Sequence, residues 1–192
     1  MSVGEVEGDR ERPGAAEPTA RLFVGIWPPP EVAAVLSDLE RPALEAVRWV
    51  PPEQLHVTVA FLGDVALSRL DDVQAALGAA MARAAAPPEA HLGPSSRRVG
   101  RSVLWVPVAG LDDLAGSVRR SLGTLLPGAG LDAPFEGHLT LARARGRRTI
   151  PAALAGAPIE ASWRVLAADL VRSELDPAGA RYTRFATVAV PW

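Results

Sequence analysis

The chain has 192 residues, of which 48% are hydrophobic and 22% are charged. This length suits one ordinary domain, and this composition supports a packed core and excludes a wholly disordered chain. The absence of cysteine excludes disulfide frameworks, thiolate nucleophiles and cysteine-bound metal centres, and the absence of lysine excludes P-loop and Schiff-base chemistry. With a formal net charge of −2, the chain cannot hold nucleic acid by bulk charge, so any contact with RNA or DNA must be local.

Residues 1–20 are predicted to form a disordered tail, because they are polar and too poor in apolar groups to offset the entropy of ordering. This segment lacks the apolar core of a secretory signal, and no stretch reaches the roughly 18 apolar residues of a membrane span. We therefore expect a single folded domain over residues 21–192, in the cytoplasm and without membrane contact. No heptad pattern indicates self-assembly, so a monomer is expected.

Short runs of β-branched and aromatic residues bounded by Pro or Gly predict strands, and apolar residues at helical spacing predict helices. The predicted strands cover residues 22–27, 56–62, 103–108, 138–142, 163–174 and 182–190. The predicted helices cover residues 31–41, 68–86 and 111–126. Strands and helices therefore follow one another along most of the chain.

A shift of 82 residues lays the first half of the chain on the second. It places Leu22, Phe23 and Val24 on Leu104, Trp105 and Val106, residues 56–59 on 138–141, and the helix at 31–41 on 113–123. Each copy is too small to bury its own sheet face, so the repeat predicts two α+β lobes packed side by side. The lobe boundary is expected near residues 98–102, with exchange of strands between the lobes left open.

The motif His-x-Thr occurs at the same place in both copies, as His56 with Thr58 and His138 with Thr140. Side chains alternate along a strand, so each histidine shares a sheet face with its threonine while the intervening apolar residues face the core. A lone histidine in a strand is more often structural than catalytic. Repetition in register with threonine reverses that expectation, whereas His91, which has no such partner, is interpreted as surface structure.

Two imidazoles and two hydroxyls on one cleft suit reactions at a phosphodiester. Imidazole has a reference pKa of about 6.5, so one ring can take a proton from water while the other protonates the leaving oxygen. The threonine hydroxyls can donate to the non-bridging phosphate oxygens. No Asp or Glu stands beside the histidines to complete a metal shell, so neither a metal nor any other cofactor is expected.

These motifs, with their flanks, resemble the 2H phosphoesterase superfamily, and within it the bacterial and archaeal RNA 2′,3′-cyclic phosphodiesterases, historically named 2′-5′ RNA ligases. The resemblance spans about residues 21–190 and rests on residues 21–26, 49–63, 138–143, 170–175 and 179–182. It implies an α+β fold that is bilobal and pseudo-two-fold. Two antiparallel sheets with outer helices would then enclose a cleft between the lobes.

The resemblance also implies roles for individual residues. His56 would be the general acid and His138 the general base, and a cyclic phosphate on an RNA end or a nucleotide would be opened to a 2′-phosphomonoester. Phe61 and Arg143 match positions where the family places base-stacking and phosphate-binding groups. Strict alternation puts both on the face opposite the histidines, so they reach the cleft only if their strands bend. Gly137 stands where the family usually has proline, which predicts a looser approach to the strand.

Several alternatives remain open. The same two histidines permit reversible 2′-5′ RNA ligation, and an inactive module that binds RNA ends or nucleotides would need no proton-transfer groups. The four tryptophans associated with strands are interpreted as core, although Trp49 could stack on a base. The arginines fall into two clusters that either attract an RNA backbone or form solvated loops. The clusters are Arg97, Arg98 and Arg101, and Arg143, Arg145, Arg147 and Arg148.

Overall fold

The computed structural model describes residues 17–176 and 179–191. Most of the tail predicted over residues 1–20 lies outside this part, and the first strand begins at Thr19. The strands are β1 (Thr19–Ile26), β2 (Val47–Trp49), β3 (Val57–Ala66), β4 (Glu89–Leu92), β5 (Arg97–Val99), β6 (Val103–Ala109), β7 (His138–Ala144), β8 (Ala161–Arg164), β9 (Ala167–Asp176) and β10 (Gly179–Ala189). The helices are α1 (Pro30–Ser37), α2 (Leu70–Met81) and α3 (Asp112–Leu125).

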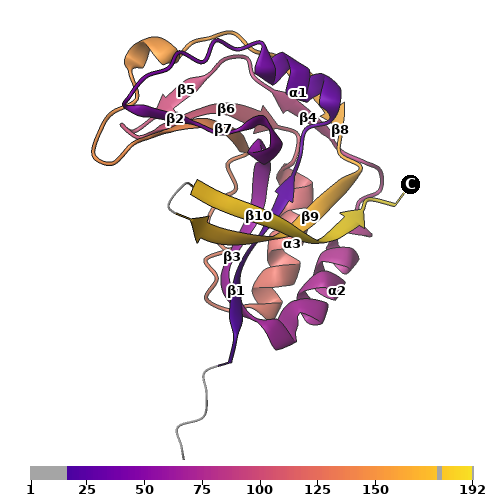
Figure 1. The fold of residues 1–192 in the computed structure, drawn as a ribbon. Coiled ribbons are helices and arrows are strands. Elements are labelled where there is room, and N and C mark those ends of the chain that lie inside the picture. Colours follow the sequence, from indigo (N-terminus) through magenta and orange to yellow (C-terminus); the bar gives the residue numbers. More distant parts are fainter. Residues whose placement is uncertain (1–16, 177–178, 192) are drawn as a thin grey trace, which may run out of the picture.

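Within the described residues the strands form one curled antiparallel sheet with the order β10-β9-β1-β3-β7-β6-β4-β8. Strand β2 pairs with β7, and β5 pairs with β6. Strands β3 and β7 meet through one residue pair, Val57 with Leu139, and the sheet therefore divides into two halves at this junction (Figure 1). The fold is the α+β, two-lobed arrangement expected from the sequence, with its two antiparallel sheets joined at their inner edges.

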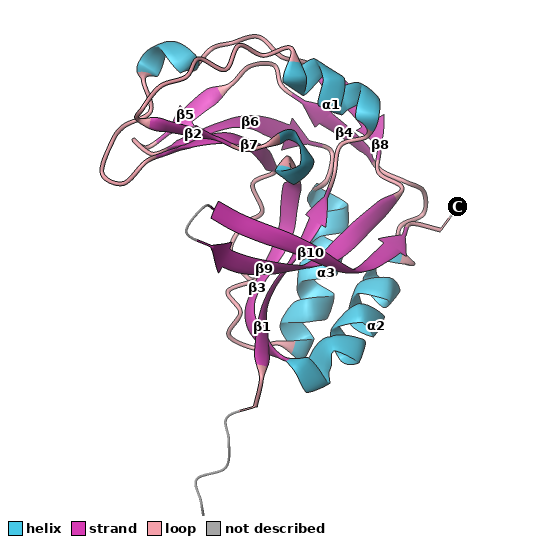
Figure 2. Ribbon diagram, viewed as in Figure 1, coloured by secondary structure: helices cyan, strands magenta, loops and turns pink. Residues whose placement is uncertain are grey.

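Two of the helices, α1 and α3, are exchanged between the halves. Helix α1 follows β1 in the chain but packs near β8 in the other half. Helix α3 follows β6 but packs against α2 and β3, so α2 and α3 lie together on the half that contains β1 (Figure 2). Each copy of the repeat thus contributes to both lobes.

The predicted lobe boundary near residues 98–102 is wrong. Residues 97–99 form β5, which pairs with β6 inside one half, so the chain does not change lobes there. It changes lobes elsewhere, for example between β8 and β9, where the strand predicted over 163–174 is interrupted by Val165 and Leu166. The cause is the exchange of elements, which no shift within the sequence reveals.

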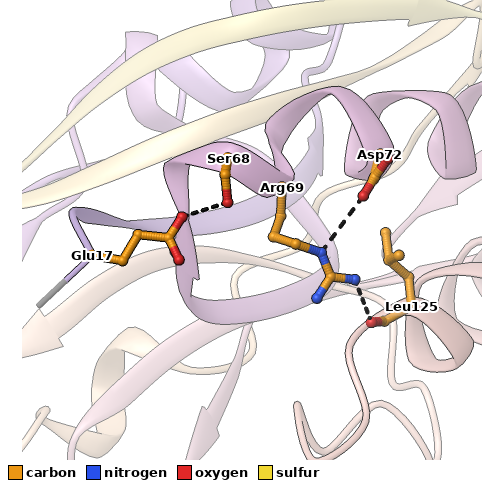
Figure 3. Close-up of polar contacts among 5 residues, drawn as sticks. All are labelled: Glu17, Ser68, Arg69, Asp72 and Leu125. Carbon is orange, nitrogen blue, oxygen red and sulfur yellow. Dashed lines mark hydrogen bonds and ion pairs between the residues drawn. The ribbon is translucent and has the colours of Figure 1, made fainter.

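Apolar residues at helical spacing join α2 to α3. Leu114, Val118 and Leu122 of α3 are buried, as are Val73 and Leu77 of α2. Arg69, just before α2, donates to the carbonyl of Leu125 at the end of α3 (3.0 Å) and forms an ion pair with Asp72 (3.6 Å), while Ser68 donates to Glu17 ahead of β1 (Figure 3). The Leu125 contact satisfies one of the carbonyls that a helix end leaves unpaired. These contacts therefore join the start of α2 to the end of α3 and to the segment before β1.

Candidate active site

A cleft of about 710 Å³ lies where the two halves meet, and both His-x-Thr motifs line it. The pairing of Val57 with Leu139 explains why: in an antiparallel pair, the residue before one partner lies across from the residue after the other. His56 therefore lies on the side of Thr140, and His138 on the side of Thr58. Because alternate side chains share a face, all four polar groups meet on one side while the Val57 and Leu139 side chains are fully buried.

The two imidazoles are oriented in the same way. Nδ1 of His56 contacts the carbonyl oxygen of Gln54 at 2.6 Å, and Nδ1 of His138 contacts that of Glu136 at 2.8 Å. A carbonyl can only accept, so Nδ1 carries a proton in both rings and Nε2 is the atom that gains or loses one. The Thr58 hydroxyl lies 3.2 Å from Nε2 of His56.

The pKa of both histidines is lowered, and burial is the main cause. For His56, the carbonyl of Gln54 opposes this effect, while the positive charges of Arg143 and His138 add to it. For His138, the carbonyl and the carboxylate of Glu136 raise the pKa, and Arg143 lowers it. In the free protein near neutral pH both rings are therefore mainly neutral.

Different aromatic rings pack on the two histidines. Trp105 covers His138 with ring centroids 3.9 Å apart, whereas Phe23 and Trp27 each lie 4.9 Å from His56. Tyr182 of β10 approaches His56 edge-on at 5.4 Å. His56 is thus surrounded by more rings than His138.

The strand pairing also corrects the alignment of the two copies. Thr58 pairs with Gly25, and Thr140 pairs with Trp105, so the first strands of the copies correspond at a separation of 80 residues rather than 82. The counterpart of Trp105 is therefore Gly25 and not Phe23. A two-residue error preserves the alternation of faces, which is why the pattern of apolar residues did not reveal it.

Phe61 and Arg143 both line the cleft, which strict alternation does not allow. Each strand has a register shift just ahead of the residue, and the two residues before it are buried in succession: Val59 with Ala60 in β3, and Leu141 with Ala142 in β7. An extra residue in a strand reverses the alternation beyond it. The bend required by the sequence argument is therefore a bulge, and it occurs at the same place in both copies.

Gly137 departs from its prediction. A Cβ at this position would lie 2.2 Å from the carbonyl oxygen of Val108. The backbone N–H of Val108 also donates to the carbonyl oxygen of Gly137 at 2.8 Å. The glycine therefore permits a close approach of two backbone segments directly before His138, rather than a looser one.

Of the two arginine clusters, only part of the second lines the cleft. Arg143 and Arg145 line the cleft together with Arg48, which no motif in the sequence singles out, and Arg181, which lies in the segment 179–182 that carries part of the resemblance but was given no role. Arg148 instead forms an exposed ion pair with Glu45 at 2.6 Å. The cluster of Arg97, Arg98 and Arg101 is not among the described residues that line the cleft; Arg98 and Arg101 donate to Ile150 and Thr149.

The tryptophans were only partly interpreted correctly. Trp163 is buried in the core, as expected, but Trp27 and Trp105 are half-buried against the histidines and Trp49 lines the cleft. His91 is exposed in β4, which confirms its interpretation as surface structure. Tyr182 comes from a strand more than 120 residues beyond His56; it lies in the segment 179–182 that carries part of the resemblance, but the sequence assigned it no role in the site.

Among the described residues, no group of three or more His, Asp or Glu side chains is placed to hold a metal ion. The cleft lining offers imidazoles, hydroxyls, guanidinium groups and aromatic rings, together with the carboxylate of Asp176. This set provides proton transfer at two opposed atoms, hydrogen bonds to an anion and surfaces for stacking.

A duplicated α+β fold that gathers two His-x-Thr motifs in one cleft defines a two-histidine phosphoesterase. Residues 28–177 match the family model described as the 2′-5′ RNA ligase superfamily. The chain is 36% identical over 176 residues to the RNA 2′,3′-cyclic phosphodiesterase of Thermus thermophilus, covering 85% of this chain and 86% of that protein. The chain belongs to the 2′-5′ RNA ligase superfamily of 2H phosphoesterases.

Solved structures of similar proteins have the same fold. The crystal structure of TT0787 of Thermus thermophilus has a TM-score of 0.72 at 33% identity, covering 88% of this chain and 97% of that one. The structure of E. coli LigT complexed with 3′-AMP has a TM-score of 0.67 at 26% identity, covering 91% of this chain and 100% of that one. The likeness therefore extends over nearly the whole fold.

Proposed function

We propose that this chain hydrolyses 2′,3′-cyclic phosphodiester ends of RNA to 2′-phosphomonoesters, without a metal, by general acid–base catalysis. The observation that carries the proposal is the pair of histidines in one cleft, each with Nδ1 held by a backbone carbonyl and Nε2 left for proton transfer. The Thermus relative named as an RNA 2′,3′-cyclic phosphodiesterase supports the same reaction.

In this scheme His138 is the base. Neutral His138 takes a proton at Nε2 from a water molecule, whose oxygen then attacks phosphorus. Burial favours the neutral form by lowering the pKa of His138, and the carboxylate of Glu136 stabilises the imidazolium that forms. Each acid or base role is typically worth about 10²–10⁴ in rate.

His56 is the acid. Its protonated ring donates from Nε2 to the ribose 3′ oxygen as the bond between phosphorus and that oxygen breaks, which leaves the phosphate on the 2′ oxygen. Burial lowers the pKa of His56, and a lower pKa makes the imidazolium a stronger acid. After one turnover His138 carries the extra proton and His56 is neutral, and exchange with solvent restores both.

The remaining cleft residues bind the substrate. Thr58 and Thr140 donate to the non-bridging oxygens, on which negative charge grows during the attack. Arg143 adds a fixed positive charge beside them, and Phe61, with 43% of its surface exposed, offers a ring for a base to stack on.

Ligation uses the same groups in the same roles. A 5′-hydroxyl would replace water as the nucleophile, and by microscopic reversibility the two histidines, with their roles exchanged, can also cleave the 2′-5′ bond that forms. RNA carrying a 2′,3′-cyclic phosphate on one end and a 5′-hydroxyl on another would then be joined through a 2′-5′ bond.

The test is an assay of the purified chain on RNA with a 2′,3′-cyclic phosphate end, in EDTA, with products resolved as 2′- or 3′-phosphates. We expect the 2′-phosphate at an unchanged rate after chelation. A 3′-phosphate product refutes the assigned polarity, and loss of activity in EDTA alone refutes the metal-free scheme. Tight binding without turnover from pH 5 to 8 favours an inactive binding module, and joined RNA favours ligation.

None of the described helices is both long enough and apolar enough to cross a membrane. We infer that RNA ends or cyclic nucleotides are the partners of this chain, that it acts as a monomer, and that it works in the cytoplasm. Size-exclusion chromatography with light scattering tests the monomer.

A further inference from the structure

Three residues that are not among those lining the cleft form a chain of contacts that ends on His56. Trp27 stacks on the imidazole with ring centroids 4.9 Å apart and planes 21° from parallel. The guanidinium carbon of Arg184 lies 4.9 Å from the centroid of the Trp27 ring. Nε of Arg184 forms an ion pair with Oδ2 of Asp169 at 3.0 Å.

We propose that Asp169, Arg184 and Trp27 form a clamp that positions the imidazole of His56 for proton transfer. None of the three is among the described residues that line the cleft, so their effect on a reaction there must pass through His56. They are positioning residues rather than catalytic ones, and the proposal rests on the proposed function for its kinetic consequence.

The clamp is anchored in the sheet. Asp169 of β9 is nearly buried, with 11% of its side chain exposed, and it also accepts a hydrogen bond from the Thr187 hydroxyl at 2.5 Å. A buried carboxylate with two donors has a fixed position, and it anchors the guanidinium that pairs with it, although 57% of the Arg184 side chain is exposed. The anchored guanidinium then lies over one face of the indole in a cation–π contact.

The indole is fixed in its own plane as well. Trp27 Nε1 donates to the carbonyl of Glu53 at 3.0 Å, and the next residue, Gln54, supplies the carbonyl that holds Nδ1 of His56. One short turn therefore positions both rings of the stack. Gly25 leaves the space they need, because a Cβ there would lie 2.8 Å from Cζ3 of Trp27.

The other copy of the repeat positions its histidine differently. Trp105 occupies the place that corresponds to Gly25 and covers His138 directly at 3.9 Å. At His56 the covering ring comes from the end of β1 instead, and the arginine and aspartate of the last two strands hold it in place. The clamp thus acts on His56 alone, which allows His138 to serve as an internal reference.

The test compares Arg184→Met with Arg172→Met in the full chain. Arg172 lies on the same hairpin and also has an ion pair, to Glu174 at 2.9 Å, but the guanidinium over the Trp27 ring is that of Arg184. Two quantities are measured: kcat and KM on cyclic-phosphate RNA, and the imidazole proton resonances of His56 and His138 by NMR, which shift with the ring current of a stacked indole.

For Arg184→Met we expect kcat to fall about 10-fold with KM changed by less than about two-fold, because misplacement of a reacting group costs rate rather than binding. The His56 resonances should move and those of His138 should not, and Arg172→Met should change neither. Trp27→Leu should reproduce both effects, and Trp27→Phe, which keeps a stacked ring, should restore most of the rate.

Two results in Arg184→Met would overturn the clamp. One is that the His56 resonances stay at their wild-type positions, and the other is that they move while kcat keeps its wild-type value. If Arg184→Met does not fold, Arg184→Lys, which keeps the charge beside Asp169 but lacks the planar guanidinium, gives the same two measurements. If the wild-type chain turns over no cyclic-phosphate RNA, the proposed function fails, and the resonances alone decide the clamp.

Discussion

Replacement of Gly137 by alanine tests how tightly the backbone before His138 is constrained. The new Cβ would lie 2.2 Å from the carbonyl oxygen of Val108, whereas ordinary contacts begin at 3.4 Å. The other atom is backbone, so no side-chain rotation relieves the clash, and the segment that carries His138 must move by about 1 Å. A displacement of that size at a reacting group costs up to about 10² in rate, and overpacking costs about 1–3 kcal/mol in stability.

The measurement is kcat on cyclic-phosphate RNA together with the free energy of unfolding in urea. The matched control is Gly78→Ala in α2, where a Cβ meets nothing within 4 Å. The control should keep wild-type activity and gain up to about 1 kcal/mol, because alanine is the better helix former. Wild-type activity and stability in Gly137→Ala would refute the close approach.

Three further outcomes follow from the site. Because the pKa of both histidines is lowered, the bell-shaped profile of kcat/KM against pH should reach its maximum below about pH 6.5, and a maximum above about pH 7.5 contradicts the burial argument. Because the pKa of each histidine is lower in the folded chain than in the unfolded chain, the unfolded chain binds protons at a higher pH. The free energy of unfolding should therefore fall as the pH drops below about 6.5, and a rise over that range in urea titrations would contradict the argument. Arg143→Met and Phe61→Ala should each raise KM more than they lower kcat. The control is Arg101→Met, which lies outside the cleft lining, and equal KM values for all three variants would exclude both residues from the substrate site.

Period-two alternation was sufficient to place the catalytic candidates. It put His56 and Thr58 on one face of their strand, and His138 and Thr140 on one face of theirs, and all four line the cleft. Alternation is a property of the strand itself, so the sequence contains it. The same rule failed for Phe61, because a bulge depends on the register of the partner strand and leaves no mark in the pattern of apolar residues.

The sequence could not identify which elements are exchanged between the lobes, for a related reason. Helix α1 is adjacent in sequence to β1 but packs on the other half, and a local pattern records which face of a helix is apolar without recording what covers it. The short strands β2, β4 and β5 were missed because three or four residues hold too little periodicity to detect. Arg48 enters the cleft from one of these strands, which explains why it was overlooked.

The central claim is that His138 acts as base and His56 as acid, and the most direct measurement is the pH dependence of the residual rate in His138→Ala and in His56→Ala. A base must be unprotonated and an acid must be protonated, so the first variant should lose the decline at low pH and the second the decline at high pH, each with a rate reduced by about 10² or more. Both declines retained in either variant, or the two declines exchanged between them, would contradict the account.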